Sequence, residues 1–106
     1  MNQVKVINIA KDFSEEPIGR FPTDSDFNGQ RFREEFLIPA LSKFDKVIIQ
    51  LDGTEGYGSS FLDEAFGGLV RVNKLSKEEV LNRLELISIE DESLINEIQE
   101  YIKKTH

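Results

Sequence analysis

The stretch KVIIQLDG, residues 46–53, limits the possible folds of this chain more than any other segment. It is a short apolar run rich in β-branched residues, and it ends in an Asp–Gly turn. This pattern is typical of a strand that is buried on both faces. Such a strand needs neighbouring strands and a covering layer of helices, so we expect it at the centre of an α/β sheet.

Strand-like and helix-like segments alternate on both sides of this stretch. Residues 3–10 and 84–89 alternate in polarity and predict further strands, and residues 18–21 predict a short edge strand within a turn-rich loop. The order predicts a single domain, residues 1–106, whose mixed sheet has about four strands joined by right-handed crossovers and three to four helices. Apolar spacing and capping signals predict these helices over residues 32–44 with a kink at Pro39, over 59–72, from a capping box at Ser76 to about Arg83, and from Asp91 or Glu92 to 104.

The composition excludes several classes of function. The chain has 20 acidic and 13 basic residues, a net charge of −7, so it should repel a nucleic-acid backbone. It has no cysteine, and its one histidine, His106, is the last residue, which argues against thiolate chemistry and against a serine–histidine–acid triad. The longest apolar run, residues 36–41, is too short to span a bilayer, and no leader pattern is evident. We therefore expect a cytoplasmic protein that binds neither nucleic acid nor membranes.

The segment GYGSSFLDEAFGGL, residues 56–69, combines a glycine-rich turn with an amphipathic helix. Gly67 and Gly68 inside the helix cost about 1 kcal/mol each relative to alanine. They therefore predict either close packing of a neighbouring element or close approach of a ligand or partner. The turn before the helix directs backbone N–H groups outward, which makes the helix start a candidate anion site.

Ser59 and Ser60 stand at the expected start of this helix, and two roles are open for them. Either serine can cap the helix, with Asp63 completing a capping box from Ser60. Alternatively, a serine here can accept a phosphoryl group, because the helix dipole favours negative charge at that end.

The strings KVIIQLDGTEGYGSSFLDEAFGGLVR and, before it, FNGQRFREEFLIPAL resemble the STAS-like domain family of unknown function, DUF4325, and the resemblance covers roughly residues 15–75. It implies a STAS-like fold, similar to the bacterial STAS domains of anti-sigma-factor antagonists. Those domains bind a kinase of the histidine-kinase ATPase fold and are switched by serine phosphorylation. Matched to the STAS pattern Asp-Ser-Ser/Thr-Gly-Leu, Ser60 takes the phospho-acceptor position, whereas Gly58 and Phe61 stand in place of the acid and the glycine.

The string DSDFNGQRFREE also matches the calcium-loop pattern D-x-[DN]-x-[DN]-G-x5-E. Pro22 and the turn-rich stretch before it do not suit the entering helix of an EF-hand, and Arg31 stands where that loop has an apolar residue. We therefore expect no metal site. The ligands that the pattern would supply are Asp24, Asp26, Asn28 and Glu35.

The expected function is protein binding rather than catalysis, because no general base is evident near the serines. The expected partner is a protein such as a histidine-kinase-type ATPase, with phosphorylation of Ser60 or Ser59 as the switch. The alternative is a small-ligand, nucleotide or anion-binding module that uses the same helix start. Neither function requires a cofactor. The charged residues 31 and 33–35 are expected on a solvated helix face. The predicted partner or ligand surface consists of Asp52, Gly56, Tyr57, Gly58, Asp63, Glu64 and Arg71.

Overall fold

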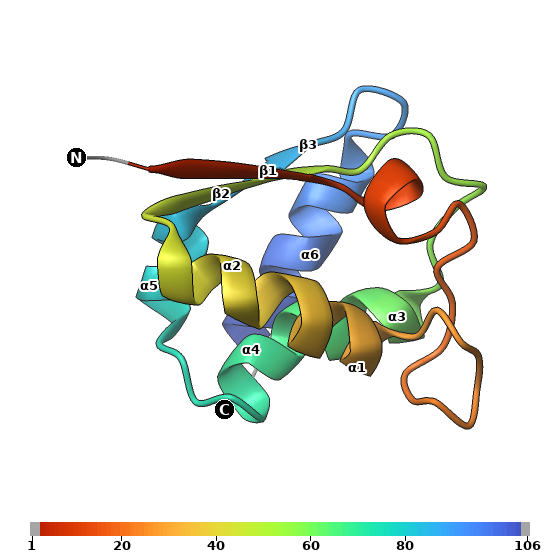
Figure 1. Cartoon of the computed structure of the whole chain (residues 1–106), viewed down its shortest axis with the longest axis horizontal. Helices are drawn as coiled ribbons and strands as arrows, with labels where there is room; N and C mark the ends of the chain where they lie inside the picture. Colours follow the sequence, from red (N-terminus) through yellow and green to blue (C-terminus); the bar gives the residue numbers. More distant parts are fainter. Residues whose placement is uncertain (1–2, 105–106) are drawn as a thin grey trace.

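Three parallel strands form the sheet of this domain, in the order β1, β2, β3 (Figure 1). The structure is a computed structural model, and it describes residues 3–104. Ile48 of β2 pairs with Val6 of β1 on one side and with Glu85 of β3 on the other. The strand predicted to be central is therefore the middle of the sheet. The strands are β1 Val4–Asn8, β2 Lys46–Gln50 and β3 Leu84–Ile87.

The sheet differs from the prediction in two ways, because it has three strands rather than four and is wholly parallel rather than mixed. The edge strand predicted at residues 18–21 is a loop instead. The Ile18 N–H donates to the Phe27 carbonyl at 3.1 Å, and the Gly19 carbonyl accepts from the Gly29 N–H at 2.9 Å. These bonds use the backbone groups that a strand would offer to a neighbour, so the segment does not join the sheet.

Two long helices, each built from three consecutive segments, supply much of the core. The first runs without a break through α1, η2 and α2, and the second through α3, η3 and α4, where each η segment is a π-helical turn. None of the helices in the described part of the chain combines the length and apolarity that a membrane crossing requires. The bounds are η1 Ile9–Phe13, α1 Gly29–Phe32, η2 Arg33–Leu37, α2 Ile38–Lys43, α3 Ser59–Leu62, η3 Asp63–Gly67, α4 Gly68–Arg71, α5 Lys77–Arg83 and α6 Ser93–Lys104.

Pro39 marks the irregular part of the first long helix. It has no N–H to donate, so the Glu35 carbonyl lacks its α-helical partner. Just before the proline, the Ile38 N–H donates to the Arg33 carbonyl, five residues back, which is the bond of a π-helical turn. The kink predicted at this proline stays a prediction, since the second long helix has the same kind of π turn, η3, without a proline.

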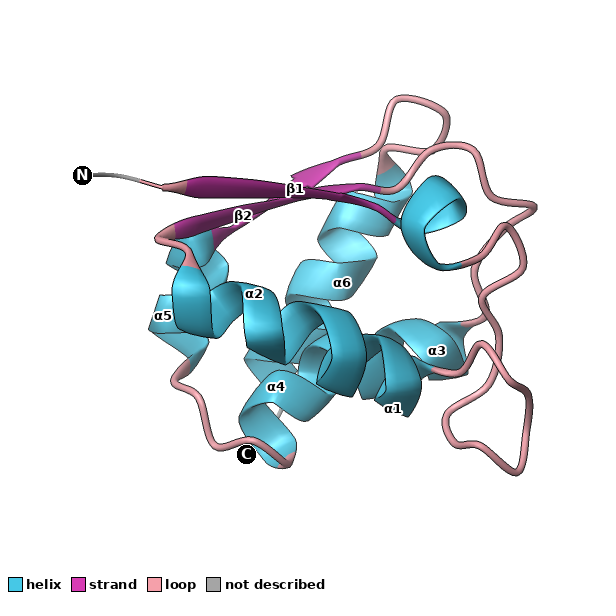
Figure 2. Ribbon diagram, in the orientation of Figure 1, coloured by secondary structure: helices cyan, strands magenta, loops and turns pink. Residues whose placement is uncertain are grey.

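The α-helices lie on one side of the sheet, as Figures 1 and 2 show. Two crossovers of the same hand, progressing in one direction across the sheet, place their helices on the same face. Side chains that face the helices are buried, with Ile7 2% exposed and Val47 and Ile49 0%. On the other face, Val4 is 52% and Val6 55% exposed. The sheet is therefore covered on one face only, which corrects the prediction that β2 is buried on both.

A cluster of phenylalanine rings forms one end of the core. The Phe32 ring centroid lies 5.9 Å from that of Phe61 and 6.3 Å from that of Phe66, so these rings join the two long helices. Phe13 lies 5.1 Å from Phe32 and ties η1 to the same cluster. The glycine-rich loop rests beside this end of the core through Tyr57, whose ring lies 6.1 Å from Phe61.

Candidate functional site

The glycine-rich loop between β2 and α3 is anchored at the carboxyl end of the sheet. The Asp52 carboxylate accepts hydrogen bonds from the Ile89 N–H at 3.0 and 3.1 Å and from the Glu90 N–H at 2.9 Å. Gly53 has φ +96° and Gly56 has φ +134°, which are conformations that side chains rarely allow. Asp52 therefore has a structural role, because it ties the turn after β2 to the turn after β3.

Tyr57 is packed against the core rather than extended at the tip of this loop. Its hydroxyl donates to the Leu51 carbonyl at 2.7 Å, and the residue is half-buried. Burial raises the pKa of Tyr57 to about 12, and the charges of Asp52 and Glu90 act in the same direction. Only part of the Tyr57 ring is therefore left for contact with a partner.

Helix α3 begins with Gly58 as its N-cap, so the prediction of a serine cap is wrong. Gly58 has φ −72° and ψ 142°, and it has no side chain that can bond to the helix start. Ser59, which is exposed, and Ser60, which is half-buried, occupy the first two helical positions. A Cβ at Gly58 would have Ile18 Cγ1 as its nearest neighbour at 3.8 Å, so packing does not require a glycine there. The helix start therefore presents its backbone N–H groups without a capping side chain.

Five charged side chains gather around η3. Asp63 lies 2.7 Å from Arg20 Nη1 and 3.5 Å from Arg71 Nη1. Glu64 lies 2.8 Å from Arg33 Nη1 and 3.4 Å from Arg71 Nη2. Arg20 Nη1 also lies 3.8 Å from Glu64. Three arginines thus surround two carboxylates, and Arg20 links its loop to the second long helix.

The Arg33–Glu64 ion pair is the buried centre of this cluster. Arg33 is 2% and Glu64 4% exposed, and Arg33 Nη1 also donates to the Glu64 backbone carbonyl at 2.5 Å. Within the described chain, Arg33 Nε has no hydrogen-bond partner. The sequence predicted Arg33 on a solvated face and Glu64 on a partner surface, and both predictions are wrong. The first and second long helices pack together here with the pair between them.

Two glycines make room for this packing. A Cβ at Gly68 would overlap Arg33 Nη1 and lie 2.9 Å from its Cζ. A Cβ at Gly29 would lie 2.6 Å from the Phe61 carbonyl oxygen and 2.9 Å from Glu64 Cβ. Gly68 is therefore explained by close packing, which is the first of the two roles that the sequence left open.

The sequence contained a signal for the burial of Arg33 that its charge obscured. Arg33 lies four residues before Leu37 and seven before Ala40, and both of these side chains are buried. That spacing places Arg33 on the apolar face of its helix. Its partner Glu64, and Arg20, which pairs with Asp63, come from distant segments, so no local pattern indicated these contacts.

The residues of the calcium-loop pattern have structural roles. Asn28 is buried and caps α1 by accepting from the Arg31 N–H at 2.9 Å. Glu35 lies 3.2 Å from Arg31 Nε, and the Asp26 backbone carbonyl accepts from Arg31 Nη1 at 2.8 Å. Asp24 accepts two backbone N–H groups of its own loop. Among residues 3–104, no group of three or more acidic, histidine or cysteine side chains is placed to hold a metal ion.

A small cavity of about 200 Å³ lies beside the glycine-rich loop. Its lining includes Tyr57, Gly56 and four carboxylate side chains. Negative charge at this density opposes an anion in the same place. The four carboxylates belong to Asp52, Glu55, Glu90 and Asp91.

These features define a small α/β domain with a parallel sheet covered on one face and a glycine-rich loop that opens the second long helix. Its family can be stated more closely. The chain belongs to the family described as STAS-like domain of unknown function (DUF4325), which it matches over residues 28–94. The match confirms the resemblance and spans β2, β3 and both long helices. No curated protein and no solved structure matches the chain.

Proposed function

We propose that this chain is a non-enzymatic regulatory domain that docks to a partner protein. The docking surface is the glycine-rich loop with the start of the second long helix, residues 52–63. The observation that carries this proposal is an exposed helix start on an anchored loop, with Gly58 as a bare N-cap, Ser59 exposed and Asp52 fixing the turn. A surface held in place before binding loses less conformational entropy when a partner docks.

The surroundings of the two serines support a role other than catalysis. The nearest carboxylates along the helix, Asp63 and Glu64, are both in ion pairs with arginines. A general base must be free to take the proton of the hydroxyl group. These two carboxylates instead serve to hold the helix and the preceding loop together.

The partner that the family resemblance implies is an ATPase of the histidine-kinase fold, and Ser60 or Ser59 is the proposed phospho-acceptor. A phosphate in the first turn would be favoured by the free N–H groups of α3. Asp63 follows Ser60 by three residues, on the same side of the helix, and it lies 2.7 Å from Arg20. A phosphoserine would compete with Asp63 for Arg20, and the loop that Arg20 belongs to would then change its contacts.

The second proposal from the sequence, a nucleotide or anion site at the same helix start, has weaker support. The cavity beside the loop is lined by four carboxylates, among them Asp52 and Glu55. Thermal unfolding with added ATP or inorganic phosphate tests this alternative directly. A rise in melting temperature that saturates with either compound would favour it over docking.

Calorimetric titration of the chain with a purified ATPase of the histidine-kinase fold, the partner that the family resemblance implies, tests the docking proposal. Glu55→Arg changes the proposed surface, and Glu85→Arg, on the open face of the sheet, is the matched control. We expect Glu55→Arg to weaken binding about tenfold or more, and Glu85→Arg to bind like the unchanged chain. No binding, or equal effects of both variants, would contradict docking through residues 52–63.

Incubation of the same pair with ATP and Mg²⁺, followed by intact-mass measurement, tests the switch separately. We expect a mass gain of one phosphoryl group that Ser60→Ala abolishes and Ser59→Ala leaves in place. A gain that moves to Ser59 would reassign the acceptor. No gain would remove the switch and leave the docking proposal standing.

A further inference from the structure

β1 is an edge strand, and part of its outer edge is open. On the side that faces β2, the Gln3 carbonyl accepts from the Lys46 N–H at 3.2 Å. Both backbone groups of a residue point to the same side of a parallel strand, and the side alternates along the chain. The N–H and C=O groups of Val4 and Val6 therefore point away from β2, toward the free edge.

The described part of β1 has one charged side chain, Lys5, and few of the other features that protect an edge strand. Charged side chains, prolines, bulges or a covering element usually keep an edge from pairing with another chain. β1 has no proline, and Val4 and Val6 are more than half exposed. Only its end is closed, where the Asn8 N–H donates to Asp12 Oδ2 at 2.8 Å.

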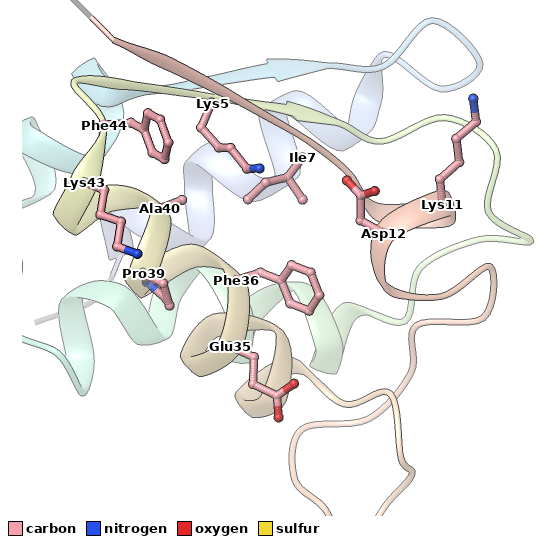
Figure 3. A pocket seen from close by; sticks show the side chains of 10 residues that line it. All are labelled: Lys5, Ile7, Lys11, Asp12, Glu35, Phe36, Pro39, Ala40, Lys43 and Phe44. Carbon is pink, nitrogen blue, oxygen red and sulfur yellow. The ribbon is translucent and has the colours of Figure 1, made fainter.

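A groove of about 760 Å³ runs along this edge, between β1 and the first long helix (Figure 3). Ile7, Phe36, Ala40 and Phe44 form its apolar floor. Every second side chain of a strand points to the same face of a sheet. A strand added to β1 would therefore direct alternate side chains toward this floor.

Lysines give the groove a positive charge. Figure 3 shows Lys5 and Lys43 beside the apolar floor, whereas Lys11 points away from it. Within residues 3–104, none of these three lysines is in an ion pair. The chain as a whole carries a net charge of −7, so this concentration of unpaired positive charge is local.

The two carboxylates that line the groove already have partners. Glu35 lies 3.2 Å from Arg31 Nε, and Asp12 accepts the Asn8 N–H. In Figure 3, Asp12 lies beyond Ile7 and Glu35 lies below Phe36, and both are away from Lys43. The end of the groove beside Lys43 and Phe44 therefore favours negative charge.

We propose that the free edge of β1 binds an extended acidic peptide segment of a partner protein by strand addition. The peptide backbone pairs with Val4 and Val6, its apolar side chains lie on the groove floor, and its Asp or Glu side chains meet Lys5 and Lys43. The peptide supplies a fourth strand to the sheet.

A second copy of this chain suits the edge less well. Antiparallel pairing of two β1 strands about Val6 would bring Lys5 and Lys43 of both copies to one seam. Like charges across a seam oppose pairing, and two chains of net charge −7 also repel each other overall. The same lysines attract the Asp and Glu side chains of an acidic peptide.

This inference does not rest on docking through residues 52–63, because it concerns the free edge of the sheet and not the loop at the carboxyl ends of the strands. The experiment uses the full chain and synthetic peptides, without the ATPase. Fluorescence anisotropy compares a labelled peptide in which Val alternates with Glu and one in which Val alternates with Lys. We expect the acidic peptide to bind about tenfold or more tightly than the basic one.

Charge reversal on the protein supplies the control. The double variant Lys5→Glu/Lys43→Glu should lose the acidic peptide and gain the basic one, whereas Lys103→Glu on α6 should leave both affinities unchanged. Equal binding of the two peptides, or no binding of either, would overturn the proposal.

Amide hydrogen exchange distinguishes strand addition from a purely electrostatic contact. The bound acidic peptide should slow exchange of the Val4 and Val6 amides. Val6→Pro, which removes an outward N–H, should abolish peptide binding, whereas Val6→Thr should keep it. Peptide binding without this protection would overturn strand addition. If the free chain forms a dimer and Lys5→Glu/Lys43→Glu strengthens that dimer, the edge of β1 binds a second copy of the chain, and the peptide proposal is overturned.

Discussion

Arg33 and Glu64 are buried together between the two long helices, and Gly68 leaves the space that the Arg33 guanidinium fills. Removing one partner of a buried ion pair costs about 3–5 kcal/mol, because the other charge stays buried without compensation. A change at Gly68 acts on the same pair without removing either charge. The stability of this packing therefore depends on a residue that carries no side chain.

Gly68→Ala should destabilise the fold although alanine favours helix by about 1 kcal/mol. The added Cβ overlaps Arg33 Nη1 and displaces the guanidinium from Glu64. We expect the free energy of unfolding in urea to fall by about 2 kcal/mol or more. In the background Arg33→Met/Glu64→Leu, which lacks the Arg33–Glu64 ion pair, the same substitution should be neutral or stabilising. Equal losses in the two backgrounds would contradict this explanation of Gly68.

Tyr57 should make stability fall at alkaline pH. Burial raises its pKa from 10.0 to about 12 in the folded chain, whereas the unfolded chain exposes the phenol. Between these values the unfolded state binds fewer protons than the folded state, so the free energy of unfolding decreases as pH rises from about 10 to about 12. Below pH 10 the Tyr57 phenol is protonated in both states, so its contribution to the free energy of unfolding is fully present there.

Thermal unfolding as a function of pH tests this prediction, with Tyr57→Phe as the variant. From pH 10 to pH 12, the stability of Tyr57→Phe should fall less than that of the unchanged chain. At neutral pH the variant should be about 1 kcal/mol less stable than the unchanged chain, because it lacks the hydrogen bond to the Leu51 carbonyl. Tyr101, whose hydroxyl donates to Glu97 and whose pKa is also raised to about 12, accounts for part of the remaining fall. Identical pH profiles for Tyr57→Phe and the unchanged chain would show that Tyr57 is not buried as described.

Helix α3 starts without a capping side chain, and its N-cap position has room for one. Gly58→Asp should stabilise the fold by about 0.5 kcal/mol, because the carboxylate can accept from the free N–H groups and complements the helix dipole. Gly58→Ala adds a Cβ without an acceptor and should be neutral or destabilising. Urea unfolding of both variants measures the difference. An aspartate no better than alanine would contradict the N-cap position of Gly58.

Most elements were predictable because their signals are local. The helix start predicted at Ser76 is confirmed, since the Ser76 hydroxyl accepts from the Glu79 N–H at 3.1 Å and α5 ends at Arg83 as predicted. Two of the failures depend on contacts that neighbouring residues in the sequence do not indicate. Residues 18–21 bond to the end of their own loop, and Arg33 meets a carboxylate 31 residues away. Local propensity does not report such contacts.

The contacts of Arg83 with the end of α2 were not predicted from the sequence. Arg83 donates to the backbone carbonyls of Leu41, Phe44 and Asp45 and so satisfies the end of α2. A basic residue in the last turn of α5 is explained by the dipole of its own helix, and nothing in the sequence pointed to a second helix. For the candidate site, the sequence indicated the glycine-rich loop and placed the two serines at the start of the helix, but it did not indicate the ion pairs of Arg20 and Arg33.

At the scale of the whole molecule, the main feature is a parallel sheet with one open face and an open edge at β1. Parallel sheets are usually covered on both faces. Here Val4 and Val6 are exposed, and the sheet has one strand fewer than predicted. The two proposed binding places, the loop at the carboxyl ends of the strands and the edge of β1, therefore lie on separate parts of this sheet.

Docking of a partner protein on residues 52–63 can be followed residue by residue. Backbone amide chemical shifts of the isotope-labelled chain, recorded with and without an ATPase of the histidine-kinase fold, measure it. The largest changes should fall between Asp52 and Asp63, and the amides of β1 should change little. Changes confined to β1 and its groove, or no change at saturating ATPase, would show that the partner does not dock on residues 52–63.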